Sequence, residues 1–85
     1  GEEFVALLRV KDSQELTQIA ERLRKSIGSA PFLMPGGPRK MTMSIGCTLL
    51  TQGEQIDDAI KRADGGLYAA KHGGRDQVVY VPALS

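Results

Sequence analysis

The chain has 85 residues, of which 41% are hydrophobic and 25% are charged. This composition is close to the average of globular domains and argues against a disordered, collagen-like or membrane-spanning chain. With 11 Lys and Arg against 10 Asp and Glu, the net charge is only +1, so no overall field favours nucleic acid or anionic lipid. The length allows one domain, and a single cysteine, Cys47, excludes an internal disulfide.

The first half of the chain is predicted to contain a buried strand followed by a helix. Residues 4–10 form an almost continuous apolar run, which is typical of a strand buried on both faces. Asp12 or Ser13 can cap the following helix, with Glu15 in the capping-box position after Asp12. Apolar residues then recur at helical spacing: Leu16, Ile19, Ala20, Leu23 and Ile27. We expect this helix to end at Gly28.

The second half is predicted to contain two strands that flank a second helix. Residues 29–40 hold proline and glycine without an apolar period and are expected to form a loop. Residues 41–49 alternate like a strand with one apolar face, on which Cys47 is expected to be a small buried hydrophobe. The next helix carries an apolar stripe: Ile56, Ala59, Ile60, Ala63, Leu67 and Ala70. It is expected to stop at residues 73–74, before a short strand at 78–81.

This order of strand, helix, strand, helix and strand predicts an α+β fold. We expect a mainly antiparallel sheet with the helices packed on one side of it. Gly1, Glu2 and Glu3 lead directly into the doubly buried run, although chain termini and sheet edges are usually polar. We therefore expect a further strand, before Gly1, that pairs with residues 4–10 as a hairpin.

Two pairs of charged residues could carry chemistry, and each pair also has a structural explanation. Glu2 and Glu3 supply oxygen ligands of the kind that Mg²⁺ prefers, or they belong to a solvated turn. Lys71 and Arg75 flank the glycines at 73–74, which would allow the backbone to approach an anion such as a triphosphate. Alternatively, these cations complement the C-terminal dipole of the second helix. Composition and spacing alone leave both explanations open.

The remaining histidine and the aromatic residues predict no further site. His72 is a lone imidazole and is given no role. The aromatic residues are Phe4, Phe32, Tyr68 and Tyr80. They do not alternate with basic residues as a stacking platform for single-stranded nucleic acid would, so we expect no nucleic-acid partner.

Three motifs occur in order along the chain. Residues 1–4 read GEEF, residues 43–46 read MSIG, and residues 63–71 read ADGGLYAAK, followed by GRD at 74–76. In this order they resemble the C-terminal half of a GGDEF domain, the diguanylate cyclase family, beginning inside the signature motif. The resemblance extends over most of the chain and implies a bacterial signalling protein. It favours the functional explanation for both charged pairs.

The resemblance implies a fold related to polymerase palms and adenylyl cyclases. It implies a reaction in which two GTP molecules, one per domain, condense to cyclic di-GMP with release of pyrophosphate. The reaction would be assisted by Mg²⁺ or Mn²⁺ at the interface of two GGDEF domains, so GTP and a second GGDEF domain are the implied partners. A fused sensor or regulatory domain is also implied. The implied location is the cytoplasm, or the cytoplasmic face of a membrane-anchored parent, without membrane contact from this segment.

The resemblance also implies roles for individual residues. Glu2 would be a metal ligand and the candidate proton acceptor, with Glu3 as a second acidic member of the catalytic site. Gly1 would let the turn bring the backbone close to the nucleotide. Lys71 and Arg75 would bind the β- and γ-phosphates.

Parts of the family's pattern lie outside this sequence. The other metal-binding aspartate, the guanine-recognising residues and the product-inhibition site are expected before Gly1. Residues 1–85 are therefore predicted to be a partial GGDEF domain without its N-terminal half, nearly inactive alone. Gly65 and Gly66 replace an alanine-containing pair and are expected to weaken the helix by about 1 kcal/mol each. The alternatives are an inactive GGDEF-type regulatory module that binds GTP or a protein partner, and an unrelated interaction module.

Overall fold

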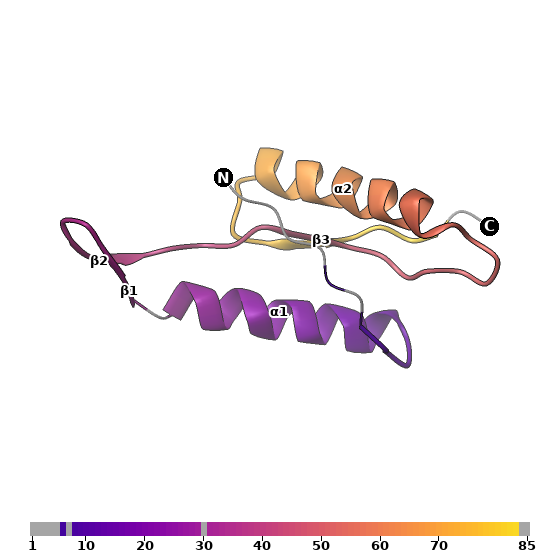
Figure 1. The fold of residues 1–85 in the computed structure, drawn as a ribbon, viewed down its shortest axis with the longest axis horizontal. Helices are drawn as coiled ribbons and strands as arrows, with labels where there is room; N and C mark the ends of the chain where they lie inside the picture. The colour runs from indigo at the N-terminus through magenta and orange to yellow at the C-terminus, as the bar shows by residue number, and fades with distance from the viewer. Residues whose placement is uncertain (1–5, 7, 30, 84–85) are drawn as a thin grey trace.

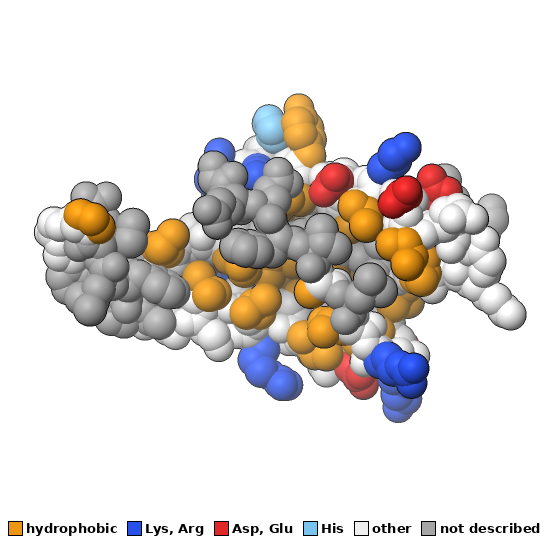
Figure 2. All heavy atoms as spheres, in the orientation of Figure 1, with side chains coloured by type: hydrophobic (Ala, Val, Ile, Leu, Met, Phe, Trp, Pro, Cys, Tyr) orange, Lys and Arg blue, Asp and Glu red, His pale blue; other side chains and the backbone are white. Residues whose placement is uncertain are grey.

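The computed structural model describes residues 6, 8–29 and 31–83. Their helices and strands follow the order α1 (Ser13–Ser29), β1 (Pro31–Met34), β2 (Gly37–Lys40), β3 (Ile45–Cys47), α2 (Ile56–His72) and β4 (Val78–Tyr80). Strands β3 and β4 lie between the two helices, and the β1–β2 hairpin extends from one end (Figure 1). Figure 2 shows hydrophobic side chains in the band between the helices and charged side chains along the outer edges.

The sheet between the helices is parallel, so the prediction of a mainly antiparallel sheet is wrong. The paired residues of β3 and β4 are Ile45 and Val78, Gly46 and Val79, and Cys47 and Tyr80. The reason is the connection between the strands, because a helical crossover such as α2 returns the chain in its original direction. Among the described strands, the β1–β2 hairpin alone is antiparallel.

The helices cover opposite faces of β3 and β4, whereas they were expected on one side (Figure 1). Gly46, which the alternation placed on the less apolar face of its strand, lies against α2. Because side chains alternate along a strand, Ile45 and Cys47 face the other way, toward α1. Cys47 is buried as predicted, and burial raises the pKa of its thiol. The face of β3 that carries Gly46 therefore packs against helix α2.

Helix α2 and strand β3 meet backbone to backbone at two glycines. A Cβ atom on Gly46 would collide with the α2 backbone at Ala63 and Leu67, and it would lie 2.7 Å from the carbonyl carbon of Gly66. A Cβ atom on Gly66 would lie 3.0 Å from the carbonyl oxygen of Val79 in β4. Real Cβ atoms rarely approach other atoms this closely. Gly66 is therefore required by helix packing and does more than weaken α2.

Residues 31–40 form a hairpin, so the expected loop over 29–40 is wrong. Its strands are antiparallel, from the pair Pro31 and Lys40 to the pair Met34 and Gly37. The turn contains Pro35 and Gly36, and Gly36 has a φ of 100°. Proline followed by a glycine with positive φ favours a tight turn. Proline and glycine without an apolar period predicted a loop, but edge strands such as these tolerate proline.

The N-terminal strand predicted at residues 4–10 lies partly outside the described residues. Ala6 and residues 8–10, which are described, form no strand. The capping of α1 is confirmed: the Glu15 N–H donates to Asp12 Oδ1 at 2.9 Å, and the Lys11 N–H donates to Glu15 Oε1 at 3.3 Å. The helix continues to Ser29, one residue beyond its expected end.

A part-buried ion pair holds the loop between β3 and α2. Arg62 on α2 donates two hydrogen bonds to the Glu54 carboxylate, one of them from Nη2 to Oε1 at 2.8 Å. The same guanidinium donates to Thr48 Oγ1 and to the Leu49 carbonyl oxygen, both at 2.7 Å. Only 13% of either charged side chain is exposed. The hydrogen bond from Arg62 and those from Thr51 lower the pKa of Glu54 from 4.5 to about 2.

The two adjacent glycines of α2 should respond oppositely to alanine. Gly65 is exposed, and a Cβ atom added to it would meet no other atom within 4 Å, so Gly65→Ala should raise the free energy of unfolding by about 1 kcal/mol through helix propensity. Gly66→Ala should lower it by about 1–3 kcal/mol because the added methyl group overpacks the contact with β3 and β4. Urea denaturation of the intact domain containing this chain would measure both. Equal effects of the two substitutions would contradict the glycine contact.

Protonation of Glu54 should weaken the fold in acid. Since the folded-state pKa is depressed to about 2, the ionised carboxylate contributes stability above pH 4.5 and loses that contribution as the pH falls toward 2. Glu54→Gln should lower the melting temperature at pH 7, and the difference from the unmodified protein should shrink between pH 4.5 and 2. Gln55→Ala, at an exposed neighbour without a side-chain cap bond, is the control. A constant difference across this pH range would contradict the ion pair's contribution.

Candidate functional site

The structure describes the cationic half of the predicted site. Lys71 lies in the last turn of α2, and Arg75 lies in the turn that follows it. The acidic half, Glu2 and Glu3, and the neighbouring Gly1 lie outside the described residues, so their roles stay predictions. Elsewhere in the part of the chain that the structure describes, no three His, Cys, Asp or Glu side chains are grouped as a metal site would require.

The end of α2 has the hydrogen bonds of a glycine-terminated helix. The Gly73 N–H donates to the Ala69 carbonyl oxygen at 2.8 Å, and the Arg75 N–H donates to the Ala70 carbonyl oxygen at 2.9 Å. Gly74 has a φ of 115°, which reverses the chain after the helix. The predicted stop at residues 73–74 is confirmed. The same turn carries Arg75 away from the helix axis while its amide stays bonded to α2.

Lys71 and Arg75 present their charges beside this turn. Arg75 is exposed and Lys71 is half-buried. No hydrogen bond or ion pair joins either side chain to another residue within the described ranges. Lysine supplies a compact charge, and arginine supplies a planar fork that binds phosphate through two hydrogen bonds. This combination suits a polyphosphate.

Asp76 joins the turn to the rest of the fold. Its carboxylate Oδ1 accepts a hydrogen bond from Arg24 Nη1 on α1 at 2.9 Å, across 52 positions of sequence. Its backbone N–H donates to Ser44 Oγ, just before β3, at 3.1 Å. Arg24 in turn binds Glu21 through Nε and Nη2, at 3.2 and 2.9 Å. Sequence reasoning missed this group because no local pattern pairs residues so far apart.

The ion pairs of Arg24 with Glu21 and Asp76 shift the pKa values of Arg24 and Glu21 toward their charged forms. The hydrogen bonds that Arg24 donates to Glu21 and then to Asp76 raise the pKa of Arg24 further above its ordinary value. The hydrogen bond from Arg24 lowers the pKa of Glu21. The guanidinium of Arg24 therefore stays charged and keeps both carboxylates as partners.

His72 contacts Tyr68, one turn earlier on α2. Its ring stacks on Tyr68, with centroids 3.9 Å apart and planes at 25°. Its Nδ1 lies 2.9 Å from the Tyr68 carbonyl oxygen one turn earlier. Both side chains are exposed on α2.

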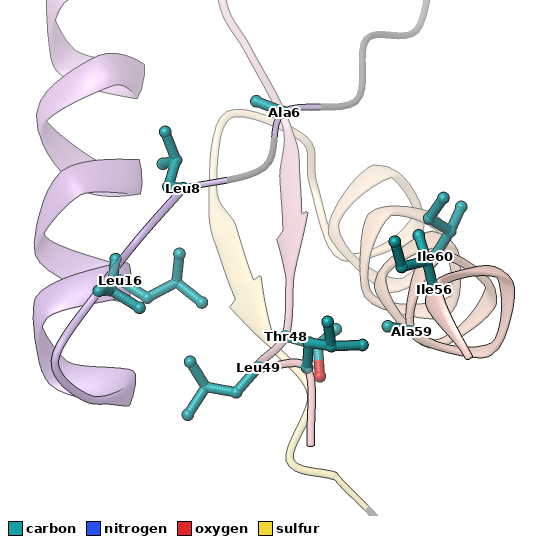
Figure 3. A pocket seen from close by; sticks show the side chains of 10 residues that line it. Ala6, Leu8, Leu16, Thr48, Leu49, Ile56, Ala59 and Ile60 are labelled. Atoms are coloured by element: carbon teal, nitrogen blue, oxygen red, sulfur yellow. The ribbon is translucent and has the colours of Figure 1, made fainter. Parts of the chain in front are cut away.

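An apolar pocket of about 140 Å³ lies near the other end of α2, between that helix and α1 (Figure 3). Its lining includes Leu16 from α1, Leu49 after β3, and Ile56 and Ile60 from α2. The Thr48 hydroxyl, the polar group at its wall, donates to the Val81 carbonyl oxygen at 2.6 Å. A nucleotide needs charged or free polar partners, so this pocket is a poor candidate for the substrate site.

Comparison with known proteins identifies the family. A family model described as diguanylate cyclase, GGDEF domain, matches residues 1–77. The diguanylate cyclase DgcP of Pseudomonas aeruginosa is 41% identical over 78 residues, which cover 92% of this chain and 12% of that protein. The diguanylate cyclase DgcM of Escherichia coli is 40% identical over 79 residues, covering 93% and 18%. The response regulator PleD of Caulobacter vibrioides is 37% identical over 82 residues, again covering 93% and 18%.

The chain thus spans less than a fifth of the length of these relatives. Neither described helix is long and apolar enough to cross a bilayer. The sequence motifs, the position of Lys71 and Arg75 at the end of α2, and a family match over residues 1–77 agree. The chain belongs to the GGDEF domain family.

Proposed function

We propose that this chain is part of a diguanylate cyclase, which condenses two GTP molecules to cyclic di-GMP and releases pyrophosphate. The observation that carries the proposal is the placement of Lys71 in the last turn of α2 and of Arg75 in the turn that follows it, with no side-chain partner for either among the described residues. The printed names of DgcP and DgcM, at 41% and 40% identity, support the same reaction. The intact GEEF motif at residues 1–4 supports a catalytic rather than a purely regulatory domain.

The cationic residues would act on the triphosphate. Lys71 and Arg75 would bind the β- and γ-phosphate oxygens and hold the α-phosphate in position for attack. When the bond to the α-phosphate breaks, negative charge grows on the leaving pyrophosphate. Fixed cations at that place lower the energy of the transition state because they need little reorganisation.

The acidic residues would act on the attacking ribose. Glu2 would accept the proton of the 3′-hydroxyl group, and Glu3 would add a second carboxylate to the site. Carboxylate oxygens are also the ligands that Mg²⁺ and Mn²⁺ take, so this donor set fits such an ion. When bound, the ion supplies Lewis-acid stabilisation of the phosphate charge. Gly1 would let the backbone pass close to the nucleotide.

The chain would form one half of a single domain. We place residues 1–85 in the C-terminal part of a GGDEF domain, with the guanine-recognising residues and the other metal-binding aspartate in the part before it. Each domain would bind one GTP, so the product would form between two domains. A sensor or regulatory domain in the parent chain fits the response regulator among the relatives. Because GTP is a cytoplasmic nucleotide, the activity belongs in the cytoplasm or at the cytoplasmic face of a membrane.

The activity can be tested on the intact domain that contains this chain. With GTP and Mg²⁺ it should release pyrophosphate and cyclic di-GMP, and Glu2→Ala should lower kcat by about 10²-fold or more through loss of the proton acceptor. Chromatography of the products and a pyrophosphate-release assay would measure both. GTP binding without either product would instead indicate a regulatory module.

The phosphate contacts require a separate test. Arg75→Ala and Lys71→Ala should each raise the KM for GTP about tenfold, the effect of losing one charge-assisted contact. Lys61→Ala, at an exposed lysine on α2 two turns or more from Lys71, is the matched control and should leave KM unchanged. An equal effect of all three substitutions would show that overall charge, and not this turn, attracts GTP.

A further inference from the structure

The turn that carries Arg75 is held in an unfavourable backbone conformation. Arg75 has a φ of 62° and Asp76 a φ of 47°, so two consecutive residues other than glycine occupy the left-handed region. Side chains disfavour this region, although aspartate tolerates it better than most residues. Such a pair persists where the surrounding structure determines it. The contacts of Asp76 identify what determines it here.

Asp76 is bound through its side chain and its backbone to separate elements. Its Oδ1 accepts from Arg24 Nη1 at 2.9 Å, and its carbonyl oxygen lies 3.5 Å from the same nitrogen. Its N–H donates to Ser44 Oγ at 3.1 Å. These contacts orient the peptide that joins Arg75 to Asp76. The backbone of Arg75 is thereby fixed on one side by Asp76 and on the other by its own bond to Ala70.

Arg24 is itself oriented before it reaches the turn. Glu21 accepts from Nε and Nη2 of Arg24, which leaves Nη1 directed at Asp76. A guanidinium is planar, so fixing two of its nitrogens fixes the direction of the third. Only 20% of the Arg24 side chain is exposed, compared with 46% of Asp76. Helix α1 thus supplies a rigid support for a turn that follows α2.

We propose that Arg24 and Asp76 are positioning residues that set the direction in which Arg75 meets the phosphates of GTP. This proposal rests on the proposed function, in which Arg75 is a phosphate ligand. Asp76 touches no substrate in this scheme, and its Oδ1 accepts a hydrogen bond from Arg24. Asp76 is half-exposed, and an ion pair with a solvent-exposed partner contributes little to global stability. Its loss should therefore appear mainly in GTP binding.

The proposal predicts a distinctive pattern of KM values in the intact domain. Arg24→Gln and Asp76→Ala should each raise the KM for GTP about fivefold, because a displaced ligand binds less well. Asp76→Asn should retain most of the affinity, since asparagine keeps an acceptor oxygen and tolerates positive φ. Arg22→Gln, at an exposed arginine on the same helix, is the control and should leave KM unchanged.

Combining substitutions separates positioning from an independent structural effect. If Arg24 acts through Arg75, the double variant Arg24→Gln/Arg75→Ala should have a KM within about twofold of Arg75→Ala alone. If Arg24 acts independently, the two effects should multiply, and this result would overturn the proposal. Isothermal calorimetry with inorganic pyrophosphate, without turnover, should show the same non-additive pattern in Kd.

The outcomes distinguish this proposal from the proposed function. A normal KM and a normal pyrophosphate Kd for Arg75→Ala would show that Arg75 does not bind phosphate. The positioning proposal would then fail as well. A raised KM for Arg75→Ala with a normal KM for Arg24→Gln and Asp76→Ala would overturn the positioning proposal alone. Melting temperatures identify any variant that fails to fold. If Arg24→Gln unfolds, the positioning proposal is tested by comparing the KM of Asp76→Ala with that of Asp76→Asn. Equal KM values for these two variants would overturn the proposal.

Discussion

The contact between Gly46 and Gly66 is the constraint on which the rest of this fold depends. It brings the backbone of β3 against the backbone of α2, and no side chain is available to adjust the distance. The helix can therefore take few positions relative to the strand. Since α2 also connects β3 to β4, the same contact fixes where the chain returns and where α2 ends. The position of Lys71 and Arg75 follows from a glycine contact more than one helical turn away.

The two helices could be predicted, while the β1–β2 hairpin and the relations between the elements could not. Sequence spacings of three and four residues predict the capping by Asp12 and Glu15 and the apolar stripes of both helices. The direction of β3 relative to β4 cannot be predicted from such spacings, because side chains alternate in the same way along parallel and antiparallel strands. The face of β3 that contains Gly46 looked less apolar for a related reason. An absent side chain can mean exposure or very close packing, and only the tertiary structure distinguishes the two.

The residues of the candidate site also divide into those that the sequence could indicate and those that it could not. Lys71 and Arg75 could be named as candidates from the sequence because cations beside a glycine pair can bind an anion, but spacing alone left a structural explanation open and the family resemblance favoured the functional one. Their phosphate role stays a prediction. Arg24 and Asp76 could not be named in this way, since they lie 52 positions apart and each is ordinary in its own surroundings. The predicted roles of Glu2 and Glu3 came from the GEEF motif and stay predictions.

Local pairing, rather than net charge, determines what each charged group can do. A net charge of +1 gives no overall field that favours nucleic acid or anionic lipid. In the structure, Arg62 is paired with Glu54 near the start of α2, and Arg24 is paired with Glu21 and Asp76 near its end. Paired charges hold the helix and its flanking loops, and they add little to the net charge. Lys71 and Arg75 differ because no described residue pairs with their side chains, which lie beside a turn that the paired residues hold. A nearly neutral domain can therefore place two cations beside one turn, as the proposed phosphate site requires, and the hydrogen bond from Arg24 on α1 supports that turn.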